Sequence, residues 1–296
     1  MSFFIDSSVR EVPFTSRGDG PPLLMLAGFA QSARIWDGIL PRFTSHFNCL
    51  TFDNRGVGTR AEEVAETSLD ALADDAAAVI NAAGAGPAAV LGWSMGGAIA
   101  QKLAHRHPDL VTSLVLLSTM ARRTSVQEQW MEVRIGISES GVDRVAAELA
   151  VLPWLFTSSL LANPDRTMAL ARANASILGA TPEGMRSQAT ALVDFDARSF
   201  LPEIDVPTLV VVGAEDVLTP VQEAVVIVNS LPRAELAVLP RGGHSMILES
   251  PAETVPLILR FLRNQETSSK PRGRAIVSSA NSTPTDHGAK SREETE

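Results

Sequence analysis

The chain has 296 residues, 45% of them apolar and 20% charged, which suits one large globular domain or two small ones. Its formal net charge of −9 argues against a nucleic-acid or anionic-membrane partner, since both require a basic face. No stretch approaches the roughly 20 apolar residues of a membrane span, and residues 1–14 lack the basic region and apolar core of a signal peptide. We therefore expect a cytoplasmic protein that binds neither nucleic acid nor membrane.

Cysteine and lysine usage adds little about mechanism. The only cysteine, Cys49, lies in the apolar run FNCLTF, where a thiol is usually inert packing, and a lone cysteine forms no internal disulfide. Only three of the 25 basic residues are lysines, and this arginine and alanine bias is typical of a GC-rich bacterial genome. The oligomeric state is left open, with a homodimer allowed.

Short apolar runs alternate with helical patterns along most of the chain. Such alternation predicts an α/β fold, with a mostly parallel central sheet covered by helices on both faces. An extra hairpin is expected from residues 1–16. The predicted strands are PLLMLA (22–27), FNCLTF (47–52), AAVLG (88–92), LVLLS (114–118), TLVVVG (208–213) and ELAVL (235–239). The predicted helices are 31–44, 68–83, 95–107, 220–231 and 252–264.

The alternation breaks once, over residues 122–200, which have helical patterns and no strand candidate. A helical insertion between two strands of a parallel sheet predicts a cap over the edge of the sheet. The alternative is a helical layer packed as plain core. The predicted organisation is a core of residues 1–121 and 201–265, a helical cap of 122–200, and a polar, disordered tail of 266–296.

A candidate nucleophile follows the third predicted strand, in the segment GWSMG of residues 92–96. This segment fits G-x-S-x-G, with a strand before it and a helix after it. A serine on such a sharp turn projects its hydroxyl above the sheet, and the flanking glycines let neighbouring backbone approach closely. The sequence therefore predicts Ser94 as a nucleophile, with an ordinary tight turn as the alternative.

The serine needs a base, and the chain has five histidines. His105 and His107 end the helix after the serine, where cations are commonly structural. His46 precedes a strand, and His287 is in the tail. His244, in GGHSM, directly follows the strand ELAVL, at the sheet edge where ligands bind in this architecture. It is the predicted base, against the alternative of a surface loop histidine.

The base in turn needs an acid to fix its tautomer. Asp216 follows the strand TLVVVG, whereas the adjoining Glu215 is expected to point the opposite way. The other strand end considered, at residues 118–120, offers no carboxylate. Asp216 is therefore the predicted acid; the alternative is a cap of the next helix by an Asx-type turn.

Two backbone amides are predicted to bind the oxyanion that forms when the serine attacks a carbonyl. One is the N–H of Met95, next to the serine. The other is the N–H of Phe29, in the loop after the first predicted strand, where Gly28 allows close approach.

These segments together resemble the α/β-hydrolase superfamily over residues 10–264. The resemblance rests on LLMLAGFAQSARIWD, FDNRGVG, GWSMGG, VPTLVVVGAEDVLTP and GGHSMILESP. Within the superfamily the chain is similar to the esterase, lactonase and thioesterase branch that includes enol-lactone hydrolases. The chain order Ser94, Asp216, His244 matches that of the nucleophile-elbow hydrolases. The family commonly has histidine where this chain has Ala27, and serine soon after DNRGVG where this chain has Thr59 and Arg60.

The resemblance implies a serine hydrolase that needs no cofactor or metal and cleaves a small carboxylic ester, lactone or thioester through an acyl-serine. The apolar cap stretch around Trp154 suggests a mostly apolar substrate, and Trp93 and Trp154 are the predicted substrate contacts. Trp130 and Trp154 have plain core packing as their alternative. Alternative activities for the same triad are acyl transfer, C–C bond hydrolysis and cofactor-free peroxidase chemistry; a non-catalytic ligand receptor is the alternative from another class.

Overall fold

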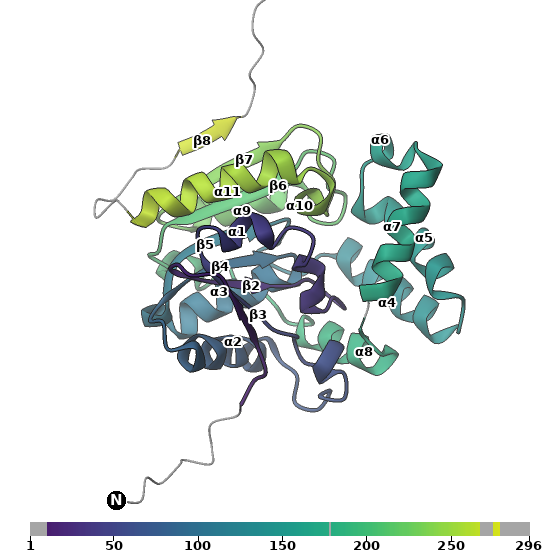
Figure 1. The fold of residues 1–296 in the computed structure, drawn as a ribbon, viewed down its shortest axis with the longest axis horizontal. Helices are drawn as coiled ribbons and strands as arrows, with labels where there is room; N and C mark the ends of the chain where they lie inside the picture. The colour runs from purple at the N-terminus through teal and green to yellow at the C-terminus, as the bar shows by residue number, and fades with distance from the viewer. Residues whose placement is uncertain (1–10, 178, 267–274, 279–296) are drawn as a thin grey trace, which may run out of the picture.

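The computed structural model of this chain describes residues 11–177, 179–266 and 275–278. The strands in this part of the chain form one eight-stranded sheet in the order β1-β3-β2-β4-β5-β6-β7-β8 (Figure 1). Neighbouring strands are parallel except β1 and β3. The strands are β1 (Thr15–Arg17), β2 (Pro22–Leu26), β3 (Asn48–Thr51), β4 (Ala88–Trp93), β5 (Val111–Leu117), β6 (Thr208–Gly213), β7 (Ala234–Leu239) and β8 (Ala275–Ser278).

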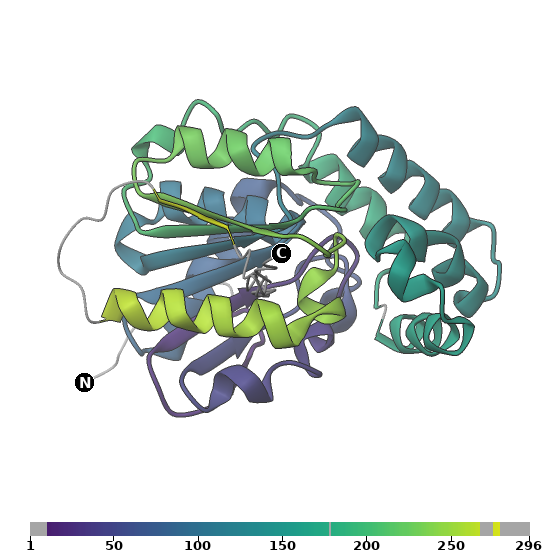
Figure 2. The same ribbon diagram turned by 90° about the horizontal axis from the view of Figure 1, so that it is seen from above.

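Helices cover both faces of the sheet, as predicted, and Figure 2 shows the sheet between α9 and α11. Successive strand residues point to opposite faces, so Leu23 and Met25 of β2 enter one core while Leu24 and Leu26 enter the other. The helices outside the segment between Leu117 and Leu201 are η1 (Ala33–Trp36), α1 (Pro41–Thr44), η2 (Gly58–Arg60), α2 (Leu69–Ala83), α3 (Met95–Arg106), η3 (Pro108–Leu110), η4 (Leu201–Glu203), α9 (Val221–Ser230), α10 (Met246–Glu249) and α11 (Pro251–Glu266).

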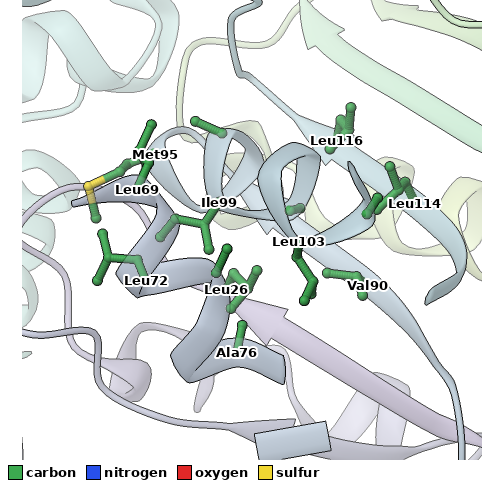
Figure 3. Packing of buried hydrophobic residues seen from close by; sticks show 14 of the residues in the cluster. Leu26, Leu69, Leu72, Ala76, Val90, Met95, Ile99, Leu103, Leu114 and Leu116 are labelled. Atoms are coloured by element: carbon green, nitrogen blue, oxygen red, sulfur yellow. The ribbon is translucent and has the colours of Figure 1, made fainter. Parts of the chain in front are cut away.

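The core nearest the candidate nucleophile lies between α2, α3 and the central strands. Figure 3 shows Leu72 of α2 and Ile99 of α3 beside Leu26 of β2. All three side chains are 1% exposed or less, so α3 is held firmly over the strands that flank it. The position at which α3 begins is therefore fixed by packing along its whole length.

Three expected elements need correction or lie partly outside the described residues. The helix predicted over 31–44 is wrong: η1 and the short α1 replace it, because Pro41 lacks an N–H and its ring clashes with the preceding turn of a continuous helix. Of the expected hairpin, residues 1–10 are outside the described part, and β1 pairs as an antiparallel edge strand with β3. Of the expected tail, residue 266 ends α11, and the only other described residues, 275–278, form β8 rather than disordered chain, since AIVS has the apolar, β-branched character that suits pairing with β7.

The residues between β5 and β6 form a separate group of helices at one end of the sheet (Figure 1). The two ends of this cap pair with each other, since the Ala197 amide donates to the Ala121 carbonyl at 2.7 Å and the Arg123 amide to the Phe195 carbonyl at 3.1 Å. The cap helices are α4 (Ser125–Glu139), α5 (Arg144–Leu155), α6 (Ser158–Leu161), α7 (Pro164–Ile177) and α8 (Pro182–Ala191).

Within the described ranges, no helix combines the length and apolar character that crossing a membrane would demand.

Candidate active site

Ser94 is the single residue between β4 and α3. Its backbone angles, φ 57° and ψ −118°, lie in a sparsely populated region that costs on the order of 1–3 kcal/mol. Two hydrogen bonds hold it there: its N–H donates to the Leu117 carbonyl at 2.9 Å, and the Thr119 hydroxyl donates to the Ser94 carbonyl at 2.7 Å. The strained turn leaves the Ser94 hydroxyl at the carboxyl edge of the sheet.

The glycines on either side of Ser94 make this turn sterically possible. A Cβ on Gly92 would lie 2.3 Å from the carbonyl oxygen of Gly96, and a Cβ on Gly96 would lie 2.1 Å from that of Leu26. Both distances are well inside van der Waals contact, so a side chain at either position would push the backbone apart. The close approach predicted from the glycine spacing is present.

The structure brings Ser94, His244 and Asp216 into one hydrogen-bonded chain. The Nε2 atom of His244 lies 3.0 Å from the Oγ of Ser94, and its Nδ1 lies 3.0 Å and 3.2 Å from the two carboxylate oxygens of Asp216. His244 and Asp216 are both 4% exposed, so little water competes for these contacts. The arrangement can remove a proton from the hydroxyl and hold the resulting positive charge.

The Asp216 carboxylate is oriented by the loop that carries it. Its Oδ1 accepts from the amides of Leu218 and Thr219 at 3.0 Å and 2.8 Å, and its Oδ2 accepts from the Thr219 hydroxyl at 2.7 Å. These contacts form an Asx-type turn, yet α9 begins later and has Pro220 at its N-cap. The carboxylate therefore both shapes its loop and contacts the imidazole, while Glu215 is exposed.

Opposing effects set the ionisation of this carboxylate. Burial, taken alone, raises the pKa of Asp216. The charge of His244 and hydrogen bonds from His244 and Thr219 outweigh burial, and together they hold the pKa of Asp216 below its ordinary value. An ionised carboxylate behind the imidazole is the state that stabilises an imidazolium.

The loop that carries His244 is fixed from two sides. On the side of the sheet, the indole N–H of Trp93 donates to the His244 carbonyl at 3.0 Å. From the cap, the Leu155 carbonyl accepts from the Ser245 amide at 2.8 Å. The imidazole is thus held by the core and by the cap together.

Phe29 and Met95, whose amides are predicted to bind an oxyanion, line the same pocket as Ser94. Met95 is the first residue of α3, so its N–H precedes the intrahelical bonds and lies at the positive end of the helix dipole. Gly28 lies against Ser94, since a Cβ there would be 3.3 Å from the Ser94 Cβ, so the residue before Phe29 is close to the nucleophile. Neither amide has a hydrogen-bond partner within the described residues.

An apolar pocket of about 20 Å³ opens onto Ser94 and His244. This volume is about that of one water molecule, so the cap is closely packed over the hydroxyl. The remaining lining residues come from the loop after β2 that carries Phe29 (the oxyanion loop), the start of α3, the segment after β5, the cap, and the loop after β6 that carries Asp216 (the acid loop). They are Phe29, Met95, Met120, Gln127, Trp130, Met131, Leu192, Leu218 and Thr219.

The two substrate contacts predicted from the sequence do not line this pocket. Trp93 is 4% exposed and packs edge-on against Trp36 beneath the site, because it is the last residue of a buried strand. Trp154 is 40% exposed on the outer side of the cap. Trp130, for which the sequence left both core packing and substrate contact open, lines the pocket and contacts Phe29 edge-on at 5.8 Å between ring centroids.

Other candidate reactive groups are engaged elsewhere. Burial raises the pKa of the Cys49 thiol to about 12, so it stays protonated. His105 and His107, at the end of α3, pair with Glu203 and Asp74. In the part of the chain that the structure covers, no group of three His, Cys, Asp or Glu side chains is placed to hold a metal ion.

Comparison with known proteins agrees with this fold and site. A family model described as alpha/beta hydrolase fold matches residues 21–251. The chain belongs to the α/β-hydrolase family. It is 31% identical over 256 residues to a pimeloyl-[acyl-carrier protein] methyl ester esterase of Nitrosomonas europaea, covering 83% of this chain and 98% of the relative.

Solved structures share the fold of this chain. A thermophilic esterase from Thermogutta terrifontis is 28% identical with a TM-score of 0.73, over 86% of this chain and 93% of the esterase. The enol-lactonase from Burkholderia xenovorans LB400 shares the fold, with 23% identity and a TM-score of 0.74, over 85% and 96% of the two chains. Relatives named as hydrolases and esterases support a hydrolytic enzyme.

Substituting Gly96→Ala tests the steric account of the turn. The added methyl meets the Leu26 carbonyl oxygen, so we expect the free energy of unfolding to fall by about 1–3 kcal/mol or more, as for other overpacked sites. Gly136→Ala, in open space on α4, is the matched control and should stabilise the protein by about 0.5–1 kcal/mol. Urea unfolding measures both. Equal stability of the two variants would contradict the account.

The lowered pKa of Asp216 predicts how stability responds to acid. Because the folded pKa lies below the unfolded value of about 3.9, ionised Asp216 stabilises the fold fully above that pH. This contribution is lost as the pH falls through the folded pKa. We expect Asp216→Asn to weaken the dependence of unfolding free energy on pH below about 5, measured from urea midpoints. If the unfolding free energies of the wild type and of Asp216→Asn change equally with pH, His244 and Thr219 do not stabilise the ionised carboxylate.

Proposed function

We propose that this α/β-hydrolase is a serine hydrolase that cleaves a carboxylic ester, lactone or thioester of a mostly apolar small molecule. The observation that carries the proposal is the continuous contact from Asp216 through His244 to Ser94, ending in an apolar pocket. The relative named as a methyl ester esterase and the solved esterase support ester bonds as the substrate class.

The geometry supports a two-step reaction. In the first step the Nε2 of His244 takes the hydroxyl proton as the Oγ of Ser94 attacks the carbonyl carbon. The tetrahedral oxyanion accepts hydrogen bonds from the amides of Phe29 and Met95, and Asp216 stabilises the imidazolium. The imidazolium returns its proton to the leaving alcohol or thiol, and an acyl-serine remains.

In the second step His244 activates a water molecule, which attacks the acyl-serine through the same oxyanion arrangement. The proton then returns to the Oγ of Ser94 as the carboxylic acid leaves. A lactone differs only in that its leaving alcohol stays attached to the acyl group, so ring opening gives one product.

The shape of the pocket favours a small acyl group. Its cavity of about 20 Å³ is lined mainly by Met, Leu and aromatic side chains, which offer apolar contact without charge. Because a cavity of this size has to widen to admit any acyl group, we expect acetyl esters to react faster than long-chain esters, for which the widening would be greater. The same side chains would also serve acyl transfer, which an added alcohol acceptor distinguishes from hydrolysis.

Kinetics on a series of p-nitrophenyl esters test the proposal. Loss of either member of a nucleophile–base pair is expected to lower kcat by about 10⁴- to 10⁶-fold, so Ser94→Ala and His244→Ala should both be nearly inactive. Ser176→Ala, on the exposed side of α7, is the matched control and should retain full activity. A Ser94→Ala enzyme that keeps a tenth of the wild-type rate would refute the serine mechanism.

A further inference from the structure

Gln188 is a buried polar residue of the cap that reaches the loop beside the nucleophile. It lies in α8, is 0% exposed, and is 94 residues from Ser94 in the chain. Its side-chain oxygen accepts from the amide of Ala30 at 2.8 Å, and its side-chain nitrogen donates to the carbonyl of Arg55 at 2.8 Å. Both ends of this amide group are therefore used, one on each of two core loops.

The Ala30 amide that Gln188 contacts belongs to a residue of the oxyanion loop with an unfavourable backbone conformation. Ala30 has φ 59°, a left-handed conformation that residues with a side chain rarely adopt. It follows Phe29 inside a turn closed by the Gln31 amide donating to the Gly28 carbonyl at 3.3 Å. The peptide plane that Gln188 holds is thus attached to the Cα of Phe29, whose own amide is the predicted oxyanion donor.

Side chains of the loop after β3 hold the two ends of the oxyanion loop, residues 27–33. Asp53 accepts from the Ala33 amide at 2.7 Å, and Asn54 lies 3.5 Å from the Ala27 carbonyl through its side-chain nitrogen. Ala27 has no polar side chain with which to fix the loop itself. At the middle of the segment, the polar contact comes from Gln188.

The support beneath Gln188 is rigid. Arg55, whose carbonyl accepts from Gln188, is anchored by its guanidinium to Asp75 at 2.7 Å and 2.8 Å, and both side chains are buried. Gly56 and Gly184 bring the loop and α8 into direct backbone contact, since a Cβ on Gly184 would lie 2.0 Å from the Gly56 carbonyl oxygen. A residue on α8 is therefore well placed to fix a backbone atom of the core.

We propose that Gln188 is a positioning residue that fixes the Phe29 amide for oxyanion binding. The inference rests on the proposed function. Without the Gln188 acceptor, the Ala30 amide loses its partner in a buried setting, and the turn relaxes away from its left-handed conformation. The Phe29 amide then moves relative to the oxygen that it has to meet, while Ser94, His244 and Asp216 keep their own contacts.

The test compares a p-nitrophenyl ester with the thionoester of the same acid. Sulfur is a weak hydrogen-bond acceptor, so the thionoester gains little from the oxyanion amides. We expect Gln188→Ala to lower kcat/KM for the ester by about 10- to 100-fold, as for other small misplacements, and to leave the thionoester rate nearly unchanged. The ratio of the two rates should therefore fall by a similar factor.

Two further variants separate positioning from stability. Gln101→Ala removes an equally buried glutamine that donates to the carbonyls of Gly97 and Met120 and does not touch the oxyanion loop. It should lower the melting temperature and leave the ester-to-thionoester ratio at the wild-type value. Gln188→Leu has a side chain of similar size without the acceptor for Ala30; it should lower the ratio as Gln188→Ala does, and it serves as the test if Gln188→Ala does not fold.

The outcomes are distinct. A wild-type ratio in both Gln188 variants would overturn the positioning role and leave the proposed function standing. Absence of ester hydrolysis by the wild-type enzyme would overturn both. A lowered ratio in Gln188→Ala and Gln188→Leu, with the wild-type ratio in Gln101→Ala, would support both.

Discussion

The chain reverses direction across one residue between β4 and α3, and the rest of the site depends on that turn. Ser94 occupies a strained conformation because Gly92, Gly96 and the backbone of Leu26 meet with no side chain between them. The turn fixes three things together: the direction of the hydroxyl, the start of α3 with its free Met95 amide, and the distance to β2. Packing of α3 against α2 and the strands holds the strained residue in place.

The cap both covers the site and positions its functional groups. It contacts each loop that carries a proposed functional group: Gln188 binds the oxyanion loop, the Leu155 carbonyl binds the histidine loop, and the Gln127 side chain donates to the Leu218 carbonyl on the acid loop at 3.2 Å. These contacts join segments that are far apart in the chain. Changes in the cap are therefore expected to alter the alignment of the catalytic groups, in addition to the shape of the pocket.

Much of the fold was predictable because its signals are local. Continuous apolar runs gave all six predicted strands, and the glycine spacing around Ser94 gave the sharp turn. The expected helix over 31–44 failed because the apolar pattern outweighed Pro41, which a helix interior excludes. The first residues of the chain and most of its tail lie outside the described part, so the predictions made for them stay predictions.

The site was predictable only as far as strand ends locate it. Carboxyl ends of parallel strands share one edge, so Asp216 and His244 could be assigned to the neighbourhood of Ser94 from position alone. The pocket wall could not be assigned, because which face of a cap helix meets the core depends on tertiary packing. Trp154 was therefore misplaced, and no pattern in the sequence marks Gln188. Trp93 was misplaced for another reason, because it is the last residue of a buried strand.

The most direct measurement of the central claim is the site of covalent labelling by a fluorophosphonate. The folded protein should take up one equivalent, and peptide mapping by mass spectrometry should locate it on Ser94. Unfolding in urea beforehand, which removes the His244 contact and leaves the serine in place, should abolish the labelling. Labelling at another residue, or none in the folded protein, would contradict an activated hydroxyl at this turn.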